Sequence, residues 1–252
     1  MKIVLITQDE SFYLYDCISY LLSNLPEQHR LVSVVLLSES PYGRKEGFFR
    51  KALKTVHIFG VKFFSYYAYK FVINRFLKRK TLRRLLLAAG IPELELPESI
   101  NAQSSLEKIR SLTPDLLISI SANEIFKKPL LEIAPCLNLH TSPLPAYRGL
   151  MPSFWVLKNG EEETAVTVFQ VDEGIDTGPI VVQRFFKIAG DTHAGLIARS
   201  KMMGMEAVLE AIECIVKKSP TVPSRDAVIS SYFGFPTRRD VQQFYATGAR
   251  FF

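Results

Sequence analysis

The stretch that most constrains the fold and function of this chain runs from Cys136 to Val182 and reads CLNLHTSPLPAYRGLMPSFWVLKNGEEETAVTVFQVDEGIDTGPIVV. Its first five residues alternate like a short buried strand, in which residues i and i+2 project to the same face. Asn138 and His140 therefore project together. The proline-rich run that follows ends the strand in a stiff loop, which Gly149 closes.

A third polar side chain follows the next predicted strand. Residues 164–172 alternate like a half-buried strand and run into EGIDTG, a turn whose two glycines let the backbone approach a ligand closely. Asp176 lies in this turn. Because ligands of open α/β sheets bind outside the carboxyl ends of the strands, Asn138, His140 and Asp176 are predicted to form one site.

These three side chains suit the transfer of an acyl group to an amine. That reaction must stabilise an oxyanion, take a proton from the attacking amine and give one to the leaving nitrogen. Asn138 offers a neutral N–H donor, His140 donates when protonated, and Asp176 pairs with the imidazolium. Such a site needs no metal and no covalent intermediate. A Ser-His-Asp hydrolase built on Ser142 is the weaker interpretation, because no second suitable histidine lies beside that serine.

The same residues carry a family resemblance. The motif N-x-H-x-S-x-L-P-x-x-R-G, followed further along by D-E-G-x-D-T-G, resembles the catalytic core of the 10-formyltetrahydrofolate-dependent formyltransferases. That family includes methionyl-tRNA formyltransferase, glycinamide ribonucleotide transformylase and the amino-sugar N-formyltransferases. The resemblance is strong over residues 114–182 and reaches residues 1–7, but it is weak or absent over residues 42–89 and the tail. Pro143 stands where family members more often have Leu.

The resemblance implies that 10-formyltetrahydrofolate is the cosubstrate and that two loops bind it. In the family, the loop after the predicted strand 115–121 lines the folate pocket, and the loop before Asp176 wraps the pteridine ring. An ordinary βα turn with Ile125 and Phe126 in the core is an equally open interpretation of the first loop. In the second loop, backbone contacts are favoured over side-chain contacts. The candidate folate-binding residues are Asn123, Glu124, Ile125, Phe126, Val171, Asp172 and Glu173.

The candidate acceptor-binding residues are Ser142, Arg148 and Trp155. The run R-G-x-x-P-x-F-W, from Arg148 to Trp155, resembles the amino-sugar members of the family. Trp155 is the only tryptophan in the chain. It suits an apolar wall for a sugar or folate, and a buried packing role is at least as well founded.

The remaining pattern predicts the fold class. A short apolar strand at 3–7, helical spacing over 11–24 and a second strand at 31–38 form a βαβ start. The first turn contains no glycine, so it is neither a dinucleotide fingerprint nor a P-loop. We therefore predict an α/β fold: a Rossmann-like open, mostly parallel twisted sheet with helices on both faces, plus a short C-terminal appendage. Residues 94–96 are predicted as a short edge strand.

The expected organisation is a catalytic domain over residues 1–218 and a C-terminal extension over residues 219–252. At 252 residues and 48% hydrophobic residues, the chain can bury a full core. Asp191 or Thr192 is predicted to cap a long helix ending near residue 218. Thr237 and Asp240 are close to a capping box and predict a last short helix.

A basic helical insertion is predicted at about residues 43–89. From Arg44 to Arg84 the chain carries thirteen Lys or Arg residues and one acid, Glu46, in a chain whose net charge is +6. One interpretation is an insertion whose many aromatic side chains pack on the sheet while its charges are solvated. The other is a docking surface for a phosphate-rich partner or an anionic membrane surface. No uncharged run in the segment is long enough to span a bilayer.

Composition narrows the remaining classes. Cys17, Cys136 and Cys214 lie far apart, so we predict neither a metal site nor a disulfide framework. The apolar run in MKIVLITQDE is too short for a signal peptide, and a cytoplasmic location is expected. His29, His57 and His193 have no catalytic context and are predicted to be surface residues.

The predicted function is transfer of a formyl group from 10-formyltetrahydrofolate to the primary amine of a nucleotide-linked amino sugar. Glycinamide ribonucleotide would need a phosphate cradle in the first βα turn, which lacks glycine. Methionyl-tRNA formyltransferases typically carry a further C-terminal domain that this tail is too short to supply, so tRNA is the alternative acceptor. A non-catalytic module that docks on RNA or membrane and retains the fold is the alternative of another class. The sequence leaves a homodimer open.

Overall fold

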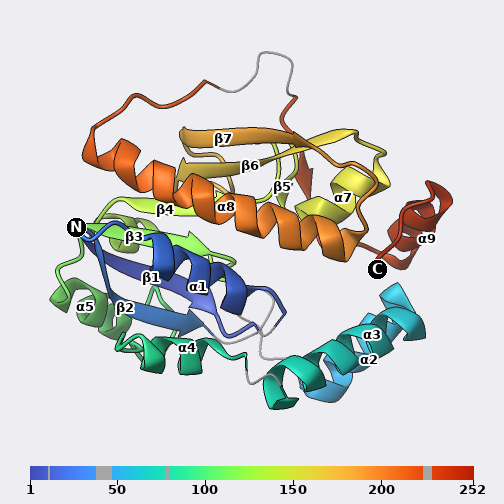
Figure 1. Cartoon of the computed structure of the whole chain (residues 1–252), viewed down its shortest axis with the longest axis horizontal. Coiled ribbons are helices and arrows are strands. Elements are labelled where there is room, and N and C mark those ends of the chain that lie inside the picture. Colours follow the sequence, from blue (N-terminus) through green and yellow to red (C-terminus); the bar gives the residue numbers. More distant parts are fainter. Residues whose placement is uncertain (11, 38–46, 78–79, 224–228) are drawn as a thin grey trace.

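A six-stranded sheet forms the centre of the protein, in the order β2-β1-β3-β4-β6-β7 (Figure 1). Our computed structural model describes residues 1–10, 12–37, 47–77, 80–223 and 229–252. The first four strands in that order are parallel, β6 is antiparallel to β4, and β7 is antiparallel to β6. The predicted mostly parallel α/β sheet is confirmed. The strands are β1 (Lys2–Gln8), β2 (Arg30–Leu37), β3 (Leu116–Ile120), β4 (Cys136–His140), β6 (Glu163–Gln170) and β7 (Ile180–Lys187).

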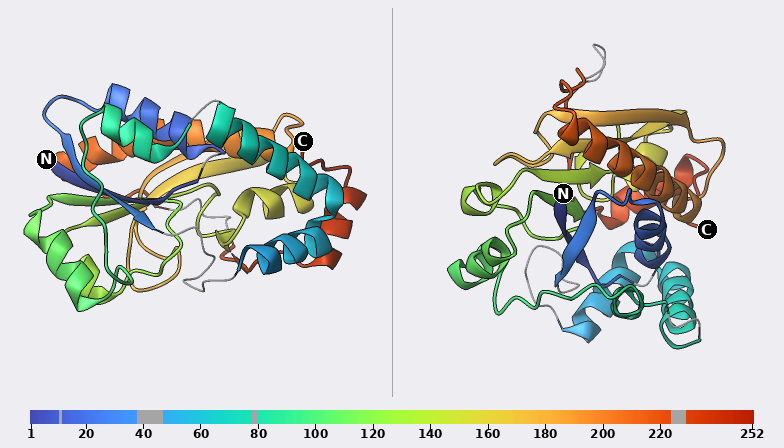
Figure 2. Two further views of the ribbon diagram at one scale, coloured as in Figure 1. Left: turned by 90° about the horizontal axis from the view of Figure 1, so that it is seen from below. Right: turned by 60° about the vertical axis from the view of Figure 1, so that its left-hand side comes forward.

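Helices cover both faces of the sheet (Figure 2). Residues alternate along β1, so Ile3 and Leu5 pack in one apolar cluster and Val4 and Ile6 pack in another on the opposite face. Each fully buried side chain of this size stabilises the fold by about 1.5–3 kcal/mol. The helices on the first face are α1 (Leu14–Asn24), α4 (Leu82–Ala88) and α8 (His193–Val216), and those on the second are α5 (Gln103–Ser111) and α6 (Lys128–Leu131).

Both predicted helix caps are present. Thr192 precedes α8, and its hydroxyl accepts a hydrogen bond from the Gly195 N–H. Thr237 and Asp240 form a reciprocal capping box at the start of α9 (Arg238–Ala246). These local signals fix the helix starts because they satisfy N–H groups that have no partner within the helix.

Two predictions are wrong. Residues 94–96 form no strand, and only an isolated bridge joins Glu93 to Val34. His29 and His193 are not surface residues, since they are 6% and 3% exposed. The His29 ring lies 2.9 Å from a Glu213 carboxylate oxygen, and His193 lies among aromatic rings at the start of α8. His57 is exposed as predicted.

The basic segment folds into α2 (Phe48–Phe59), α3 (Val61–Val72), a π-helical turn (Ile73–Leu77) and α4. Arg44, Lys45, Glu46, Lys78 and Arg79 lie outside the described residues. Inner aromatic side chains of α2 and α3 pack against the tail. The expectation that the aromatic side chains of this segment pack on the sheet is therefore wrong for these rings. Phe59 and Phe63 stack with their ring centres 4.5 Å apart, and both meet the Phe251 ring edge-on.

The tail also contacts the segment that follows β4. Its short strand β8 (Tyr232–Phe233) pairs in parallel with β5 (Arg148–Gly149), and α9 contacts α7 (Pro152–Lys158) and α2. Residues 229–252 thus pack against the segment that follows Asn138 and His140. Within the described ranges, no helix combines the length and the apolar character needed to cross a bilayer.

Candidate functional site

A pocket of about 690 Å³ opens at the carboxyl ends of β1, β3 and β4. Residues 119–126, 138–141 and 149–153 supply much of its lining, together with residues of the turn that joins β6 to β7. Its size suits a drug-sized or cofactor-sized ligand. The position agrees with the rule that open α/β sheets bind ligands beyond the carboxyl ends of their strands.

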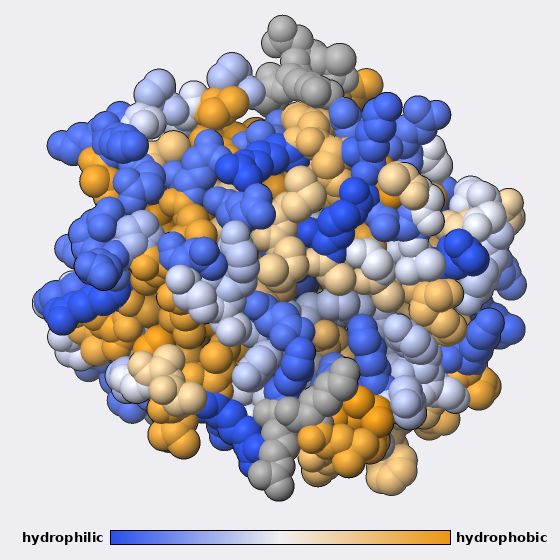
Figure 3. Space-filling view, in the orientation of Figure 1, coloured by the Kyte–Doolittle hydropathy of each residue, from blue (hydrophilic) through white to orange (hydrophobic). Residues whose placement is uncertain are grey.

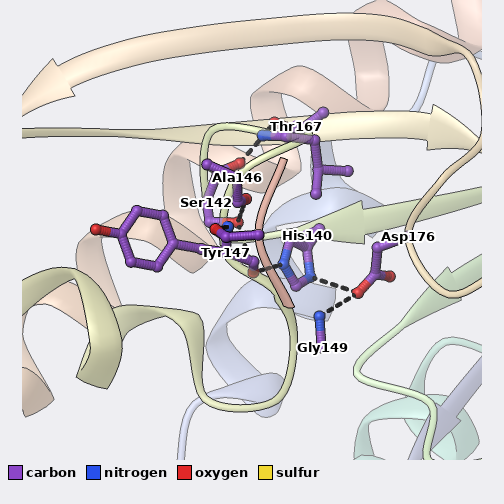
Figure 4. A network of polar contacts seen from close by, with 9 residues as sticks. His140, Ser142, Ala146, Tyr147, Gly149, Thr167 and Asp176 are labelled. Carbon is purple, nitrogen blue, oxygen red and sulfur yellow. Dashed lines mark hydrogen bonds and ion pairs between the residues drawn. The ribbon is translucent and has the colours of Figure 1, made fainter. Parts of the chain in front are cut away.

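Asn138, His140 and Asp176 all line this pocket. Asn138 and His140 project together from β4 because they are two residues apart, whereas Asp176 comes from the β6–β7 turn. His140 Nδ1 lies 3.7 Å from Asp176 Oδ2, and the two side chains are 8% and 14% exposed (Figure 4). The structure therefore brings the three predicted catalytic side chains to one pocket.

A backbone carbonyl fixes the tautomer of His140. The ring Nε2 lies 2.8 Å from the Tyr147 carbonyl oxygen. Because a carbonyl oxygen only accepts, Nε2 carries the hydrogen and donates it. Nδ1 then faces Asp176, and a second proton there would place both ring N–H groups beside oxygen atoms. Nε2 is therefore occupied by the loop carbonyl, whereas Nδ1 faces Asp176 at a distance too long for a hydrogen bond.

Asp176 is held in a left-handed backbone conformation, with φ of +53°. Its Oδ2 accepts a hydrogen bond of 2.8 Å from the Gly149 N–H. Gly149 has φ of +96°, and a Cβ on it would overlap the Phe233 carbonyl oxygen and approach the Tyr232 ring to 2.9 Å. Only glycine fits this position, so the carboxylate is oriented by a residue that the tail strand packs against.

A buried polar network beneath the pocket shapes the loop after β4. Ser142 Oγ lies 3.2 Å from both the Ala146 and the Tyr147 carbonyl oxygens. Thr167 of β6 donates to the Ser142 carbonyl at 2.7 Å and accepts from the Gln183 side chain at 2.9 Å. Figure 4 shows Ser142, Ala146 and Tyr147 beside His140, with Thr167 nearby. Ser142 is fully buried and does not line the pocket, so its hydroxyl acts here on the loop.

The first candidate folate loop reaches the pocket with all four residues, Asn123, Glu124, Ile125 and Phe126. The Glu124 carboxylate accepts hydrogen bonds from the Ser99 hydroxyl at 2.5 Å and from the Ile100 N–H at 3.2 Å, which ties the loop to the preceding segment. Ile125 is 54% exposed, whereas Phe126 is buried in the core. Ile125 is thus the apolar side chain of this loop that a ligand would cover.

The second candidate loop contributes Val171 and Asp172 to the pocket, but Glu173 does not line it. The Asp172 carboxylate accepts hydrogen bonds from the Gly174 N–H at 3.0 Å and from the Thr177 hydroxyl at 2.7 Å. These bonds shape the turn that carries Asp176. The Asp172 side chain therefore serves the turn.

Arg148 and Trp155 do not line the pocket. Trp155 is 7% exposed, stacks on Phe233 with ring centres 4.7 Å apart, and donates its indole N–H to the Gly234 carbonyl at 3.1 Å. Trp155 thus has the buried packing role that was the alternative to a ligand-binding wall. Arg148 forms the β5 pairing with its backbone, and its buried Nε has no hydrogen-bond partner within the described part of the chain.

Several pocket residues escaped the sequence analysis. His193, Ile197 and Lys201 recur every four residues on α8 and line the pocket. The Lys201 ammonium donates to Ser121 Oγ at 3.0 Å and lies 3.8 Å from a Glu10 carboxylate oxygen. Spacing of this kind is a detectable signal for one helix face. Two further lining side chains, Tyr232 and Phe235, lie in the tail, where no motif marks them.

His193 combines burial with a missing partner. Its Nδ1 is buried and forms no hydrogen bond to any described residue, and the ring meets Phe154 and Phe251 edge-on. Burial lowers the pKa of His193 to about 4, so the ring is neutral at pH 7. No cluster of three or more metal-ligating side chains occurs among the residues that the structure describes.

Comparisons with known proteins identify relatives by sequence and by fold. A methionyl-tRNA formyltransferase of Geobacter metallireducens is 37% identical over 146 residues, which is 57% of this chain and 47% of that protein. The chain spans about half the length of the curated relatives it matches. Two solved structures share the fold: the N-formyltransferase from Helicobacter canadensis (TM-score 0.57, 20% identity, 95% of this chain and 72% of that one) and glycinamide ribonucleotide transformylase 1 from Symbiobacterium toebii (TM-score 0.60, 21% identity, 89% and 92%).

The family model described as formyl transferase matches residues 78–212, more than half of the chain. The matched range contains Asn138, His140 and Asp176, the three side chains that the fold brings to one pocket. By this match, the chain belongs to the formyl transferase family.

Proposed function

We propose that the protein transfers a formyl group from 10-formyltetrahydrofolate to a primary amine. One observation carries this proposal: a neutral amide, an imidazole and a carboxylate, from Asn138, His140 and Asp176, face one pocket. The reaction needs a donor for the developing oxyanion and a route for one proton, and these groups supply both.

The chemistry assigns a role to each group. The amine attacks the formyl carbon, whose oxygen gains negative charge; the bond to the folate nitrogen then breaks, the amine loses a proton and the folate nitrogen gains one. The Asn138 amide and the Nδ1–H of protonated His140 are the donors for that oxygen. Asp176, 3.7 Å from Nδ1, stabilises the imidazolium while it carries its second proton. The Tyr147 carbonyl keeps the ring in the required orientation.

The two candidate loops fit a flat, polar-edged ring such as a pteridine. Ile125 and Ile175 line the pocket from the first and second loop, and they are 54% and 39% exposed. A ligand that covers large exposed aliphatic side chains removes their apolar surface from water, which stabilises the complex. The adjoining loop residues supply the backbone N–H and C=O groups that a pteridine edge requires.

For the acceptor we propose a nucleotide-linked amino sugar. The pocket lining includes the cationic side chains Lys51 and Lys201, which suit a phosphate, and the tail rings Tyr232 and Phe235, which suit a flat base. The Helicobacter canadensis N-formyltransferase of the same fold was solved with folinic acid and dTDP-3-aminofucose. Charged initiator tRNA is the second candidate, because the sequence relatives are methionyl-tRNA formyltransferases.

The deciding experiment incubates the protein with 10-formyltetrahydrofolate and, in parallel, a panel of nucleotide-linked amino sugars and charged initiator tRNA. The readout is the mass gain of one formyl group on the acceptor. We expect a sugar to gain the group, whereas formylation of tRNA alone would reassign the acceptor. A parallel titration with a reduced folate separates an enzyme from a non-catalytic relic, since a relic should show no binding at the pocket.

A further inference from the structure

The outer side of α3 and the π-helical turn carries large apolar side chains that the fold leaves exposed. Residues 61, 69, 72 and 76 fall on one side of a helix, and residue 77 extends this stripe along the turn. In Figure 3 an apolar patch lies at the lower edge of the visible face, over the end of α3. We call this stripe the α3 face: Val61, Tyr69, Val72, Phe76 and Leu77, which are 66%, 67%, 49%, 64% and 70% exposed.

The opposite side of α3 packs against the rest of the protein. Phe63 is buried and meets Phe251 with ring centres 4.8 Å apart, and Tyr67 meets Phe12 at 5.3 Å. Because these inner rings anchor the helix, the fold does not need apolar side chains on the α3 face. Ser65 separates Val61 from the cluster of Tyr69, Val72, Phe76 and Leu77, and an exposed apolar cluster of this kind marks an interaction surface.

The charge of the segment indicates what the surface contacts. Residues 47–77 contain six Lys or Arg residues and no Asp or Glu. Lys62 of α3 is exposed and lies beside the Phe252 ring. Arg50 and Lys54 of α2 are also exposed. Arg75 is paired with Asp9, 3.8 Å away, so Lys62 is the exposed cation nearest the α3 face and Arg50 and Lys54 add charge from the neighbouring helix. An apolar helix face in a segment that carries cations and no acids is the pattern of a helix that lies in the interface of an anionic bilayer.

We propose that the α3 face docks the protein on an anionic membrane surface, with its apolar side chains in the acyl boundary and its cations on lipid phosphates. Three of its side chains, Val61, Val72 and Leu77, are aliphatic and cannot stack on bases as a single-stranded nucleic acid would require. A second copy is disfavoured because a two-fold contact would oppose the same cations. This proposal is independent of the reaction proposed above.

The test uses the full chain and lipid vesicles in a flotation assay. We expect the protein to float with vesicles of equal parts phosphatidylcholine and phosphatidylglycerol and to stay in solution with phosphatidylcholine alone. Binding should weaken as salt is raised, since screening reduces the attraction of exposed charges. Failure to float with the anionic vesicles overturns the proposal.

Two variants separate the apolar and cationic contributions. Phe76→Ser with Leu77→Ser should weaken vesicle binding by about tenfold or more, because the apolar contact is lost. Lys54→Gln with Lys62→Gln should remove most of the salt dependence. The matched control is Ile229→Ser, which removes a side chain that is 85% exposed in the tail and should leave binding unchanged. Thermal unfolding of each variant shows that the fold is retained.

The competing occupants give opposite results. Tight binding of a single-stranded oligonucleotide without flotation would overturn the membrane proposal and assign the surface to nucleic acid. Concentration-dependent dimerisation that Phe76→Ser with Leu77→Ser abolishes, again without flotation, would assign it to a second copy of the chain.

Discussion

Two regions of the molecule differ in how their side chains are satisfied: the surroundings of the loop between β4 and α7, and the α3 face. Around the loop that follows β4, the Ser142 and Thr167 hydroxyls and the His140 ring are buried, and each has hydrogen-bond partners within the fold. On the α3 face, Phe76 and Leu77 are mostly exposed. Buried hydroxyls that are hydrogen-bonded within the fold, such as those of Ser142 and Thr167, hold the local geometry, whereas an exposed apolar stripe is available to something outside the fold. The contrast predicts where substitutions change activity, where they change stability and where they change neither.

The largest effect is expected at the imidazole itself. His140→Ala or Asp176→Asn should lower formyl transfer by about two or more orders of magnitude, because the oxyanion loses a donor or the imidazolium loses its partner. Turnover under saturating cosubstrate measures the loss. His57→Ala, at an exposed histidine, is the matched control and should retain full activity. Near-normal turnover in either site variant would remove the basis for the proposed chemistry.

Gly149→Ala should break both the site and the fold around it. The new Cβ would overlap the Phe233 carbonyl oxygen at a backbone φ of +96°, which displaces the N–H that holds Asp176. We expect a stability loss of about 3 kcal/mol together with a loss of activity. Denaturant unfolding measures the first and formyl transfer the second. Gly234→Ala, where an added Cβ meets nothing within 4 Å, should change neither.

The burial of His193 should make the free energy of unfolding depend on pH in the acid range. Its folded-state pKa is lowered to about 4 by burial, below that of an exposed histidine, so the unfolded chain takes up this proton first as the pH falls. The stability that this group contributes is complete above about pH 6.5 and is lost as the pH falls from there to about 4. The total loss is on the order of 3 kcal/mol.

The His193→Leu variant isolates that contribution. Its unfolding free energy, measured by urea titration at several pH values, should fall less between neutral and acid pH than that of the original protein. His57→Leu, which removes an exposed histidine, should leave the pH dependence as it is. Parallel curves for the original protein and His193→Leu would contradict the assignment.

The smallest effect is expected on the α3 face. Without vesicles, Phe76→Ser with Leu77→Ser should change the unfolding free energy by no more than about 0.5 kcal/mol per site and leave turnover unchanged, because these side chains are exposed. A large loss of stability in solution would show that the stripe belongs to the core of the protein.

The sequence predicted those parts of the site that depend on short-range geometry. The i, i+2 rule places Asn138 and His140 on one side of a strand, and the glycine turn indicates where Asp176 lies. Both signals act within a few residues, so they need no knowledge of the tertiary fold. The caps of α8 and α9 were predictable for the same reason.

The parts that escaped prediction depend on contacts distant in the sequence. His193 is buried because the first turn of α8 meets the tail, where its backbone N–H donates to the Arg250 carbonyl. Tyr232 reaches the pocket through a strand pairing of only two residues, too short to leave a periodic pattern. Trp155 was open between a ligand wall and packing, and the stacking ring that buries it, Phe233, comes from the same tail.

The pairing of β5 with β8 has a consequence for the order in which the protein is made. The ribosome completes Gly149 well before it adds Tyr232 and Phe233, and only then can β8 pair with β5 beside the Gly149 N–H that orients Asp176. The surroundings of Gly149 are therefore completed late in synthesis, so a nascent chain that has not yet reached Phe233 carries Asn138, His140 and Asp176 without the strand pairing beside the Gly149 N–H.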